Sequence, residues 1–277
     1  MPLSAPDHEQ LRARLSEVLG EPESIQAIES GTTGESFRVE TAEGRFAVKQ
    51  FGDKASYLLG PLAQFRLLER LAPLGIAPKP AAADDASRLL VTEWMDEGAP
   101  AKPSELTEPE RIAFLVEVLK ALHSVDHMIP EYSPREYAMR YVDALGGQEQ
   151  LRRRDHGLLA ELLELAQRFM RKPSEQVICH NDLTADNIFV GAKIRLIDFD
   201  FAVLAPPVID LASVAEMNRF DSNADRALLS AYFGNDEAQL QELAAARRLL
   251  CLLAHFWALA SADASAAIVA KYRIDND

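Results

Sequence analysis

The sequence predicts an α+β protein with two lobes, a small antiparallel-sheet lobe over 1–95 and a larger helical lobe over 96–277. Short segments rich in β-branched and aromatic residues, separated by glycine-containing turns, fill much of the first part. Beyond a linker rich in glycine and proline at 96–103, apolar residues recur mostly at helical spacing. We therefore expect a small lobe built on a sheet, followed by a larger helical lobe.

The first lobe is predicted to begin with a short helix over 9–19, whose leucines lie on one face. A second helix is expected over 61–74, because apolar residues form a stripe there until Gly75 and Pro78 interrupt it. The expected strands are 25–28, 36–40, 45–51 and 89–94.

The second lobe is predicted to be helical except for short apolar strands at 177–179, 188–190 and 194–197. One helix start is especially clear, because Thr107 offers a cap and a proline and acidic residues follow it. The expected helices are 108–124, 134–145, 157–171, 225–233 and 236–260.

The composition excludes several classes of protein. A net charge of −14 disfavours nucleic acid as a partner, because phosphate backbones bind basic surfaces, and it suits a cationic ligand. The longest apolar stretch, 249–260, is too short to cross a bilayer and contains His255, so we expect no membrane partner. No secretion signal precedes the first helix, and the two cysteines are expected to be buried and reduced, which favours a cytoplasmic location.

The most specific pattern is His180-Asn181-Asp182, followed by Asn187 and, beyond a predicted hairpin, by Asp198. Phosphoryl transfer needs one carboxylate to orient the attacking hydroxyl, and oxygen ligands to hold magnesium on the nucleotide phosphates. We assign Asp182 to the first task, as the catalytic residue. We assign Asn187 and Asp198 to the second, as metal ligands, because a hard ion prefers oxygen donors. The hairpin is expected to bring Asn187 and Asp198 together.

Three neighbouring polar residues have less definite roles. His180 is expected to fix the loop through hydrogen bonds to backbone groups, and Asp186 is expected to face water. Asp200 lies two positions beyond Asp198, on the same side of an extended segment, and is either a supporting residue or a metal ligand.

Lys49 is the predicted phosphate-binding cation, because it lies in a short hydrophobic strand that follows a glycine-containing turn. Glu69 is its expected partner, since it is the only acidic residue in the helix over 61–74. The turn that contains Gly31 and Gly34 could cover the phosphates with backbone amides.

The end of the strand-rich lobe is a second predicted nucleotide contact. Glu93, Trp94 and Met95 immediately precede the linker rich in glycine and proline. In a kinase fold, backbone groups at this junction hydrogen-bond the adenine. The side chains of Trp94 and Met95 either pack in the fold or touch the base.

These motifs resemble those of the aminoglycoside phosphotransferase and choline kinase superfamily. The resemblance implies a kinase-like fold, ATP and Mg²⁺ as cofactors, and a small-molecule hydroxyl as acceptor. It matches Asp182 to the catalytic base, Asn187 and Asp198 to the metal ligands, and Lys49 to the phosphate-binding lysine. Asp210 is similar to an aspartate that is usually structural in the family. Thr33 departs from the pattern, because asparagine is common at that place.

The absence of an Asp-Phe-Gly signature argues against a protein substrate, since the turn here reads Asp198-Phe199-Asp200. Asp200 and the net charge favour a cationic amino alcohol or amino sugar. A kinase of an uncharged or amino-acid alcohol, and an idle kinase-like sensor or scaffold, remain as alternatives; a metal-dependent hydrolase is disfavoured. The residues expected to wall the acceptor pocket are Tyr132, Tyr137, Tyr141, Glu216, Asp221, Phe256 and Trp257.

Overall fold

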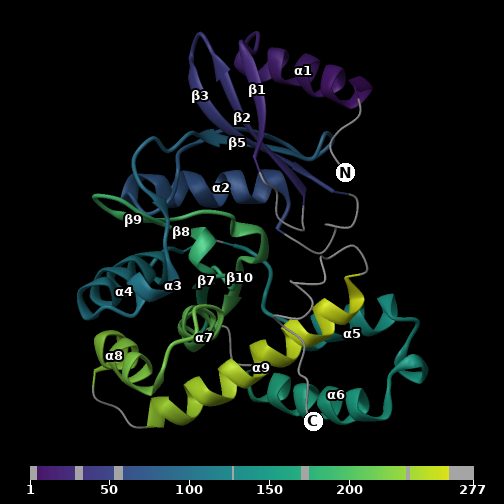
Figure 1. Cartoon of the computed structure of the whole chain (residues 1–277), viewed down its shortest axis with the longest axis vertical. Helices are drawn as coiled ribbons and strands as arrows, with labels where there is room; N and C mark the ends of the chain where they lie inside the picture. Colours follow the sequence, from purple (N-terminus) through teal and green to yellow (C-terminus); the bar gives the residue numbers. More distant parts are fainter. Residues whose placement is uncertain are drawn as a thin grey trace. The chain divides into compact units, whose positions relative to one another are not determined.

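In the computed structural model the chain divides into two compact units. The strand-rich unit contains 1–99 and 191–200, and the helical unit contains 100–190 and 201–277 (Figure 1). This division differs from the expected boundary after 95, because the segment 191–200 belongs with the first unit. There the amide of Leu196 donates to the carbonyl of Ile76 at 2.8 Å. The structure describes residues 5–28, 34–52, 59–126, 128–169, 175–234 and 238–261.

The strand-rich unit is built on a five-stranded antiparallel sheet. Four of its strands are the predicted ones. The fifth, β4, was not predicted because its sequence is mostly alanine, which has a weak preference for strands, and it forms by pairing with β5. The order across the sheet is β1 (Ser24–Ile28), β2 (Gly34–Thr41), β3 (Gly44–Phe51), β5 (Leu89–Glu93) and β4 (Pro80–Asp84).

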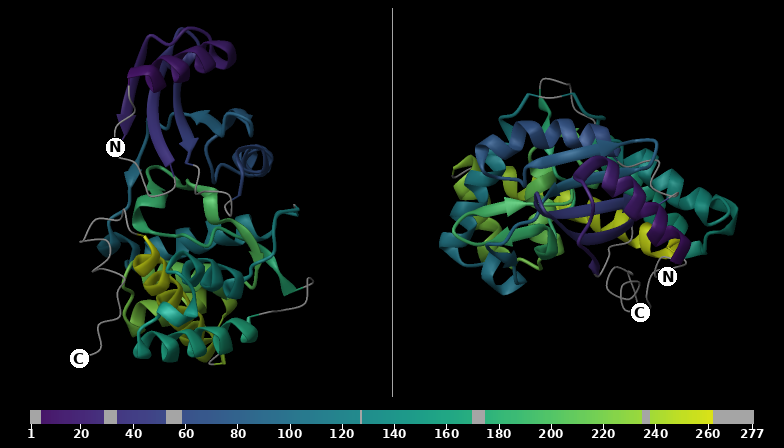
Figure 2. Two further views of the ribbon diagram at one scale, coloured as in Figure 1. Left: turned by 90° about the vertical axis from the view of Figure 1, so that its right-hand side faces the viewer. Right: turned by 90° about the horizontal axis from the view of Figure 1, so that it is seen from above.

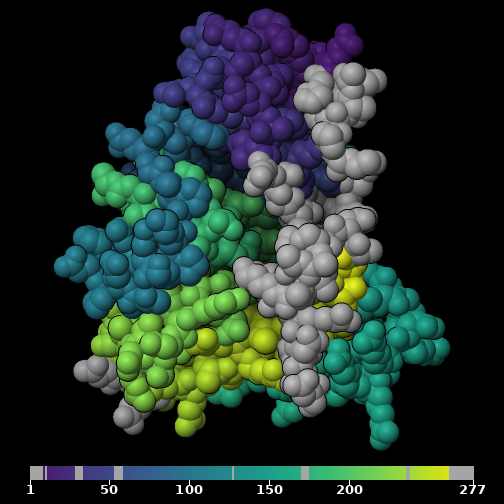
Figure 3. Space-filling view, in the orientation of Figure 1, coloured from purple at the N-terminus to yellow at the C-terminus, as the bar shows by residue number. Residues whose placement is uncertain are grey.

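The two faces of this sheet have different neighbours. Val48 and Val91 point to one face, where they pack in a buried cluster with leucines of α1 (Ala5–Leu19). Successive strand residues point to opposite faces, so Lys49 points to the other. Helix α2 (Pro61–Leu71) lies on that side (Figure 2). The space-filling view shows α1 and the first strands in purple (Figure 3).

The helical unit is organised around α9, which contacts α5, α6, α7 and α8. Among the described helices α9 alone has the length and apolar composition of a membrane span, but these contacts make it the central helix of its unit. The helices of the unit are α3 (Pro103–Leu106), α4 (Pro109–His123), α5 (Pro134–Ala144), η3 (Gln148–Gln150), α6 (Arg153–Arg168), α7 (Val208–Met217), α8 (Ser222–Phe233) and α9 (Ala238–Ala260).

Helix α7 was not predicted, although it proves central to the site. All of its residues from Val208 to Ala215 are buried. A helix that is buried on every side shows no alternation between apolar and polar faces, so the 3.6-residue period is absent from its sequence.

The remaining elements are short. Strand β7 (Val177–Cys179) forms as predicted and pairs antiparallel with β10 (Val203–Ala205), which was not predicted. Strands β8 (Ile188–Val190) and β9 (Ile194–Leu196) also form where the sequence places them. The others are β6 (Ala99–Pro100) and the 3₁₀ turns η2 (Ala72–Leu74), η5 (Ala185–Asn187) and η6 (Phe199–Phe201).

Candidate active site

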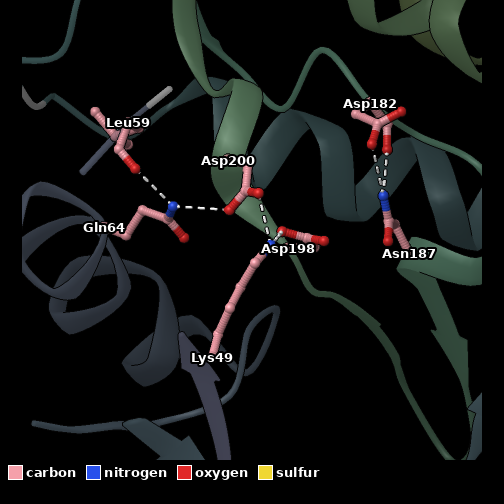
Figure 4. A network of polar contacts seen from close by, with 7 residues as sticks. All are labelled: Lys49, Leu59, Gln64, Asp182, Asn187, Asp198 and Asp200. Carbon is pink, nitrogen blue, oxygen red and sulfur yellow. Dashed lines mark hydrogen bonds and ion pairs between the residues drawn. The ribbon is translucent and has the colours of Figure 1, made fainter. Parts of the chain in front are cut away.

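Asp182 and Asn187, which the sequence assigns to catalysis and metal binding, are in direct contact in the helical unit. The amide nitrogen of Asn187 donates to the backbone carbonyl of Asp182 at 2.8 Å and to its Oδ2 at 3.0 Å (Figure 4). The turn η5 makes this possible, because it folds the chain back so that Asn187 faces Asp182 across the four intervening residues. The amide oxygen of Asn187 points away from Asp182, so it can act as a ligand (Figure 4).

Side chains of helix α7 accept hydrogen bonds from the backbone of the loop that contains Asp182. The carboxylate of Asp210 accepts hydrogen bonds from the amides of His180 and Asn181 at 2.9 and 2.7 Å. One turn further along α7, the hydroxyl of Ser213 accepts from the amide of Leu183 at 2.8 Å. Asp210 therefore acts as the supporting residue that the family resemblance implied.

Two further residues of this support were missed in the sequence. Asn218 donates from its amide nitrogen to the carbonyl of Leu183 at 2.8 Å. His123 lies with Nε2 3.1 Å from Asp210 and with Nδ1 2.6 Å from the hydroxyl of Tyr232. For Asn218 the available signal was the spacing of polar residues within the apolar segment 206–218, because a buried polar group needs a partner. His123, at the end of α4, had no such signal.

Lys49, Asp198 and Asp200 form a second group of candidate site residues, within the strand-rich unit. Its ammonium lies 2.6 Å from Oδ1 of Asp198 and 2.6 Å from Oδ2 of Asp200 (Figure 4). Both acids belong to the turn that follows β9. The side chain of Asp198 is 33% exposed and that of Asp200 only 2%. Asp200, whose role the sequence left open, therefore supports Lys49 from inside the fold.

The charges of this group perturb each other. Burial raises the pKa of Asp198 to about 7, although the ammonium of Lys49 opposes the rise and Asp200 adds to it. Burial by itself would lower the pKa of Lys49, but Asp198 and Asp200 outweigh it and raise that pKa. Two carboxylates share one ammonium, so their oxygens suit an additional hard cation. Magnesium fits this donor set.

The backbone is also unusual at both groups. Asn181 and Asp198 have positive φ angles of 63° and 64°. Asparagine and aspartate tolerate this left-handed conformation better than other residues with side chains. Such conformations persist where the surrounding structure enforces them, and they are frequent at functional sites.

The expected ion pair of Lys49 with Glu69 does not form. Glu69 is exposed on α2, whereas Gln64 of the same helix is buried and donates to Asp200 at 3.0 Å. The two positions are five residues apart, which is about 140° around a helix. Glu69 therefore points away from the lysine, and the acid that supports Lys49 comes from the turn after β9.

Of the two predicted phosphate-loop glycines, Gly31 lies outside the described residues. Gly34 is the first residue of β2. A Cβ at this position would collide with the backbone carbonyl of Gln50, so the close approach of the two strands requires glycine.

At the predicted adenine contact, side chains have structural partners. The carboxylate of Glu93 accepts from the amide of Lys79 at 3.1 Å, and the guanidinium of Arg38 lies 5.2 Å from the ring centroid of Trp94. The amide of Trp94 donates to the carbonyl of Arg45 at 2.9 Å. Met95 is partly exposed. These contacts fix the junction, and they occupy the amides of Glu93 and Trp94 as well as their side chains.

Several residues expected in an acceptor pocket have other roles. Phe256 is fully buried in the core. Glu216 is ion-paired with Arg247 at 2.9 Å, and the carboxylate of Asp221 caps the first amides of α8. Tyr132 and Tyr137, by contrast, lie together with ring centroids 6.1 Å apart.

A protein-family model covers 24–247 of this chain, and its description is a phosphotransferase enzyme family. The chain belongs to this phosphotransferase family. Curated relatives include thiamine kinases of Shigella boydii serotype 4 and of Escherichia coli O139:H28. Each is 28% identical over 193 residues, which are 69% of this chain and 65% of the relative. The chain thus spans less than two thirds of the length of these relatives.

Solved structures show that the family fold is the predicted kinase-like fold. The choline kinase LicA from Streptococcus pneumoniae superposes with a TM-score of 0.80 at 18% identity, over 97% of this chain and 96% of that one. A choline/ethanolamine kinase family protein from Mesorhizobium loti superposes with a TM-score of 0.73 at 19% identity, over 96% of this chain and 92% of that one. The spectinomycin phosphotransferase APH(9)-Ia, in complex with ADP and spectinomycin, superposes with a TM-score of 0.69 at 16% identity, over 100% of this chain and 96% of that one.

Proposed function

We propose that this chain is an ATP- and magnesium-dependent phosphotransferase that acts on a hydroxyl of a small molecule in the cytoplasm. The observation that carries the proposal is the ion pair of Lys49 with Asp198, in a member of a phosphotransferase family. A strand lysine beside a carboxylate that can bind metal is the arrangement that phosphoryl transfer requires, because catalysis depends mainly on position and charge.

In this proposal Lys49 binds the nucleotide phosphates, and Asp198 and Asn187 hold magnesium through their oxygens. The metal supplies charge neutralisation on the transferring phosphoryl group. Asp200 keeps Lys49 in place from the buried side.

Backbone groups hold the rest of the nucleotide in this proposal. The turn with Gly31 and Gly34 covers the phosphates through its amides. Glu93, Trp94 and Met95 bind the adenine through main-chain groups other than the amides of Glu93 and Trp94, which already donate to Lys79 and Arg45.

Asp182 accepts the hydrogen bond of the acceptor hydroxyl and orients its oxygen for attack on the γ-phosphorus of ATP. It takes the hydroxyl proton as the new O–P bond forms and the bond from the γ-phosphorus to the leaving ADP oxygen breaks. The hydrogen bond from Asn187 holds this carboxylate in one orientation. The activity requires Asp182 and Asn187 to act on the same nucleotide as Lys49 and Asp198, and this convergence is part of the proposal.

The acceptor is proposed to be a cationic amino alcohol or amino sugar. The net charge of −14 attracts cations, and related proteins are named as kinases of choline and of thiamine, both of which carry a permanent positive charge. The partly exposed ring of Tyr137, which lies beside the buried ring of Tyr132, offers a face that attracts such a group.

The test is an ATP-consumption screen over choline, ethanolamine, thiamine, aminoglycosides, homoserine and simple sugars, with each product identified by mass spectrometry. We expect a phosphorylated cationic acceptor, formed only with magnesium. Asp182→Ala should lower turnover at least roughly 100-fold. Asp186→Ala is the matched control, since this exposed loop residue is outside the proposed site, and it should retain wild-type turnover.

Each other outcome contradicts a definite part of the proposal. Turnover of an uncharged acceptor or an amino-acid alcohol alone would exclude the cationic class but retain the phosphotransferase. Release of phosphate without a phosphorylated acceptor would indicate a hydrolase. No stabilisation by ATP and magnesium in a thermal-shift assay would favour an idle sensor or scaffold.

A further inference from the structure

Gln64 is a buried residue of α2 that has no role in the proposed reaction so far. Its side chain is held in one direction, because its amide nitrogen donates both to the carbonyl of Leu59 at 2.7 Å and to Oδ1 of Asp200 at 3.0 Å. A primary amide nitrogen carries two hydrogens, so these two bonds use its full capacity as a donor.

A third hydrogen bond closes this arrangement. The amide of Leu59 donates to the backbone carbonyl of Asp200 at 2.8 Å. Leu59, Gln64 and Asp200 therefore form a ring of hydrogen bonds that attaches the beginning of α2 to the turn after β9. Figure 4 shows the two bonds that Gln64 donates. A shift of the helix would shift the carboxylate of Asp200 with it.

The two acids beside Lys49 are not equivalent as a result. Asp200 has one carboxylate oxygen on Lys49 and the other on Gln64, and it is buried. Asp198 contacts the same ammonium from a partly exposed position. Asp200 thus acts as the fixed partner of the lysine, and Asp198 keeps an accessible side for a ligand.

The chemistry of an amide suits this position. It donates to a buried carboxylate without adding a further charge beside Lys49, Asp198 and Asp200. A glutamate at position 64 would place a third carboxylate next to Asp200, and like charges at this distance disfavour one another.

We propose that Gln64 is a positioning residue that holds Asp200 on Lys49 and thereby sets the affinity for the magnesium–nucleotide complex. Gln64, and not the expected Glu69, is the residue of α2 that supports Lys49, and it does so through Asp200. The inference rests on the proposed function, because it assumes that Lys49 binds nucleotide phosphates.

The test measures binding of a non-hydrolysable ATP analogue with magnesium by calorimetry. Gln64→Ala should raise Kd roughly 10- to 100-fold, the usual effect of removing a group that orients a metal or phosphate ligand. In steady-state assays KM for Mg·ATP should rise, while KM for the acceptor stays unchanged. Arg66→Ala, an exposed substitution in the same helix, is the control and should bind like the wild type.

A double-mutant cycle tests whether Gln64 acts through Asp200. Asp200→Ala should itself weaken binding, and adding Gln64→Ala should then change Kd by less than about twofold. Gln64→Glu keeps the size of the side chain and replaces the donor with an acid. It should also weaken binding, and it decides the matter if Gln64→Ala fails to fold.

Two results would overturn the inference. Folded Gln64 variants that bind the analogue like the wild type would show that Asp200 needs no such support. Additive effects in the cycle would show that Gln64 acts independently of Asp200. A wild-type protein that binds no magnesium–nucleotide complex would instead overturn the proposed function, and the inference with it.

Discussion

The ammonium of Lys49 lies 2.6 Å from Oδ1 of Asp198, so strand β3 is joined to the turn after β9 by an ion pair between residues 149 positions apart. Asp200 contacts the same ammonium from the buried side. The pair therefore has two properties that can be measured separately, a contribution to folding and a contribution to ligand binding.

Lys49→Met should destabilise the protein, because it leaves the buried carboxylate of Asp200 without its cation. Removing one partner of a buried ion pair typically costs about 3–5 kcal/mol. Urea unfolding measures this loss, and binding of Mg·ATP should be lost with it. Glu69→Ala is the comparison, and its free energy of unfolding should change by less than about 0.5 kcal/mol. Equal losses in both variants would restore the expected pairing with Glu69.

Asp198→Ala should abolish the magnesium-dependent part of nucleotide binding. A ligand at 100 times its Kd stabilises the folded state by about 2.7 kcal/mol, which a thermal-shift assay detects readily. We expect this stabilisation in the wild type and in Asp182→Ala, since Asp182 acts on the acceptor hydroxyl. Asp198→Ala should show none beyond that given by ATP without magnesium. A wild-type response in Asp198→Ala would contradict its assignment as a metal ligand.

The presence of Asp182 and Asn187 in one loop after a strand could be predicted from the sequence, because the motif is short and follows an apolar segment; their direct hydrogen bond was not predicted. The pairing of Lys49 was predicted wrongly. Glu69 was chosen because it is the only acidic residue of the helix, without asking which face of the helix it occupies. The buried residues Leu67, Leu68 and Leu71 place position 64 on the same face, three, four and seven residues away. The sequence therefore showed that position 64 lies on the buried face of α2, but an uncharged glutamine there did not suggest a role in the site.

The missing elements have a different cause. Helix α7 has no polar face and β4 has little intrinsic strand preference, so the local sequence carries a weak signal in both. Helix α7 packs against α9, which is distant in the chain, whereas β4 forms by pairing with the next strand, β5. As a result Ser213 and Asn218, which support the loop of Asp182, were missed together with the helix that positions them.

The two cysteines should react slowly with a thiol reagent such as DTNB at pH 7. Burial raises the pKa of Cys179 well above its ordinary value, and burial, followed by Glu216, raises the pKa of the partly exposed Cys251. The thiolate is the reactive form, so a raised pKa lowers the reactive fraction at a given pH. The reaction of Cys251 should accelerate only at a pH above the ordinary pKa of a thiol.

Cys251→Ser should remove the reaction that accelerates at high pH. Unfolding in guanidinium should expose both thiols of the wild type. A fast reaction of a folded thiol at pH 7 would contradict the burial of these groups. The folded-state pKa values are raised, so the thiols should also make the folded state less stable as the pH rises through their unfolded value.

Asp210→Ala should loosen the loop that carries Asp182, because it removes the common acceptor of the His180 and Asn181 amides. A buried donor left without its partner costs about 1–3 kcal/mol, so the free energy of unfolding should fall by roughly 3 kcal/mol. Asp210→Asn keeps one acceptor oxygen and should lose less, and Ser213→Ala should cost about 1 kcal/mol. Amide hydrogen exchange at His180 and Asn181 should accelerate in both variants, and it should accelerate less in Asp210→Asn than in Asp210→Ala. Unchanged exchange in Asp210→Ala would show that α7 does not hold this loop, whatever the loss in overall stability.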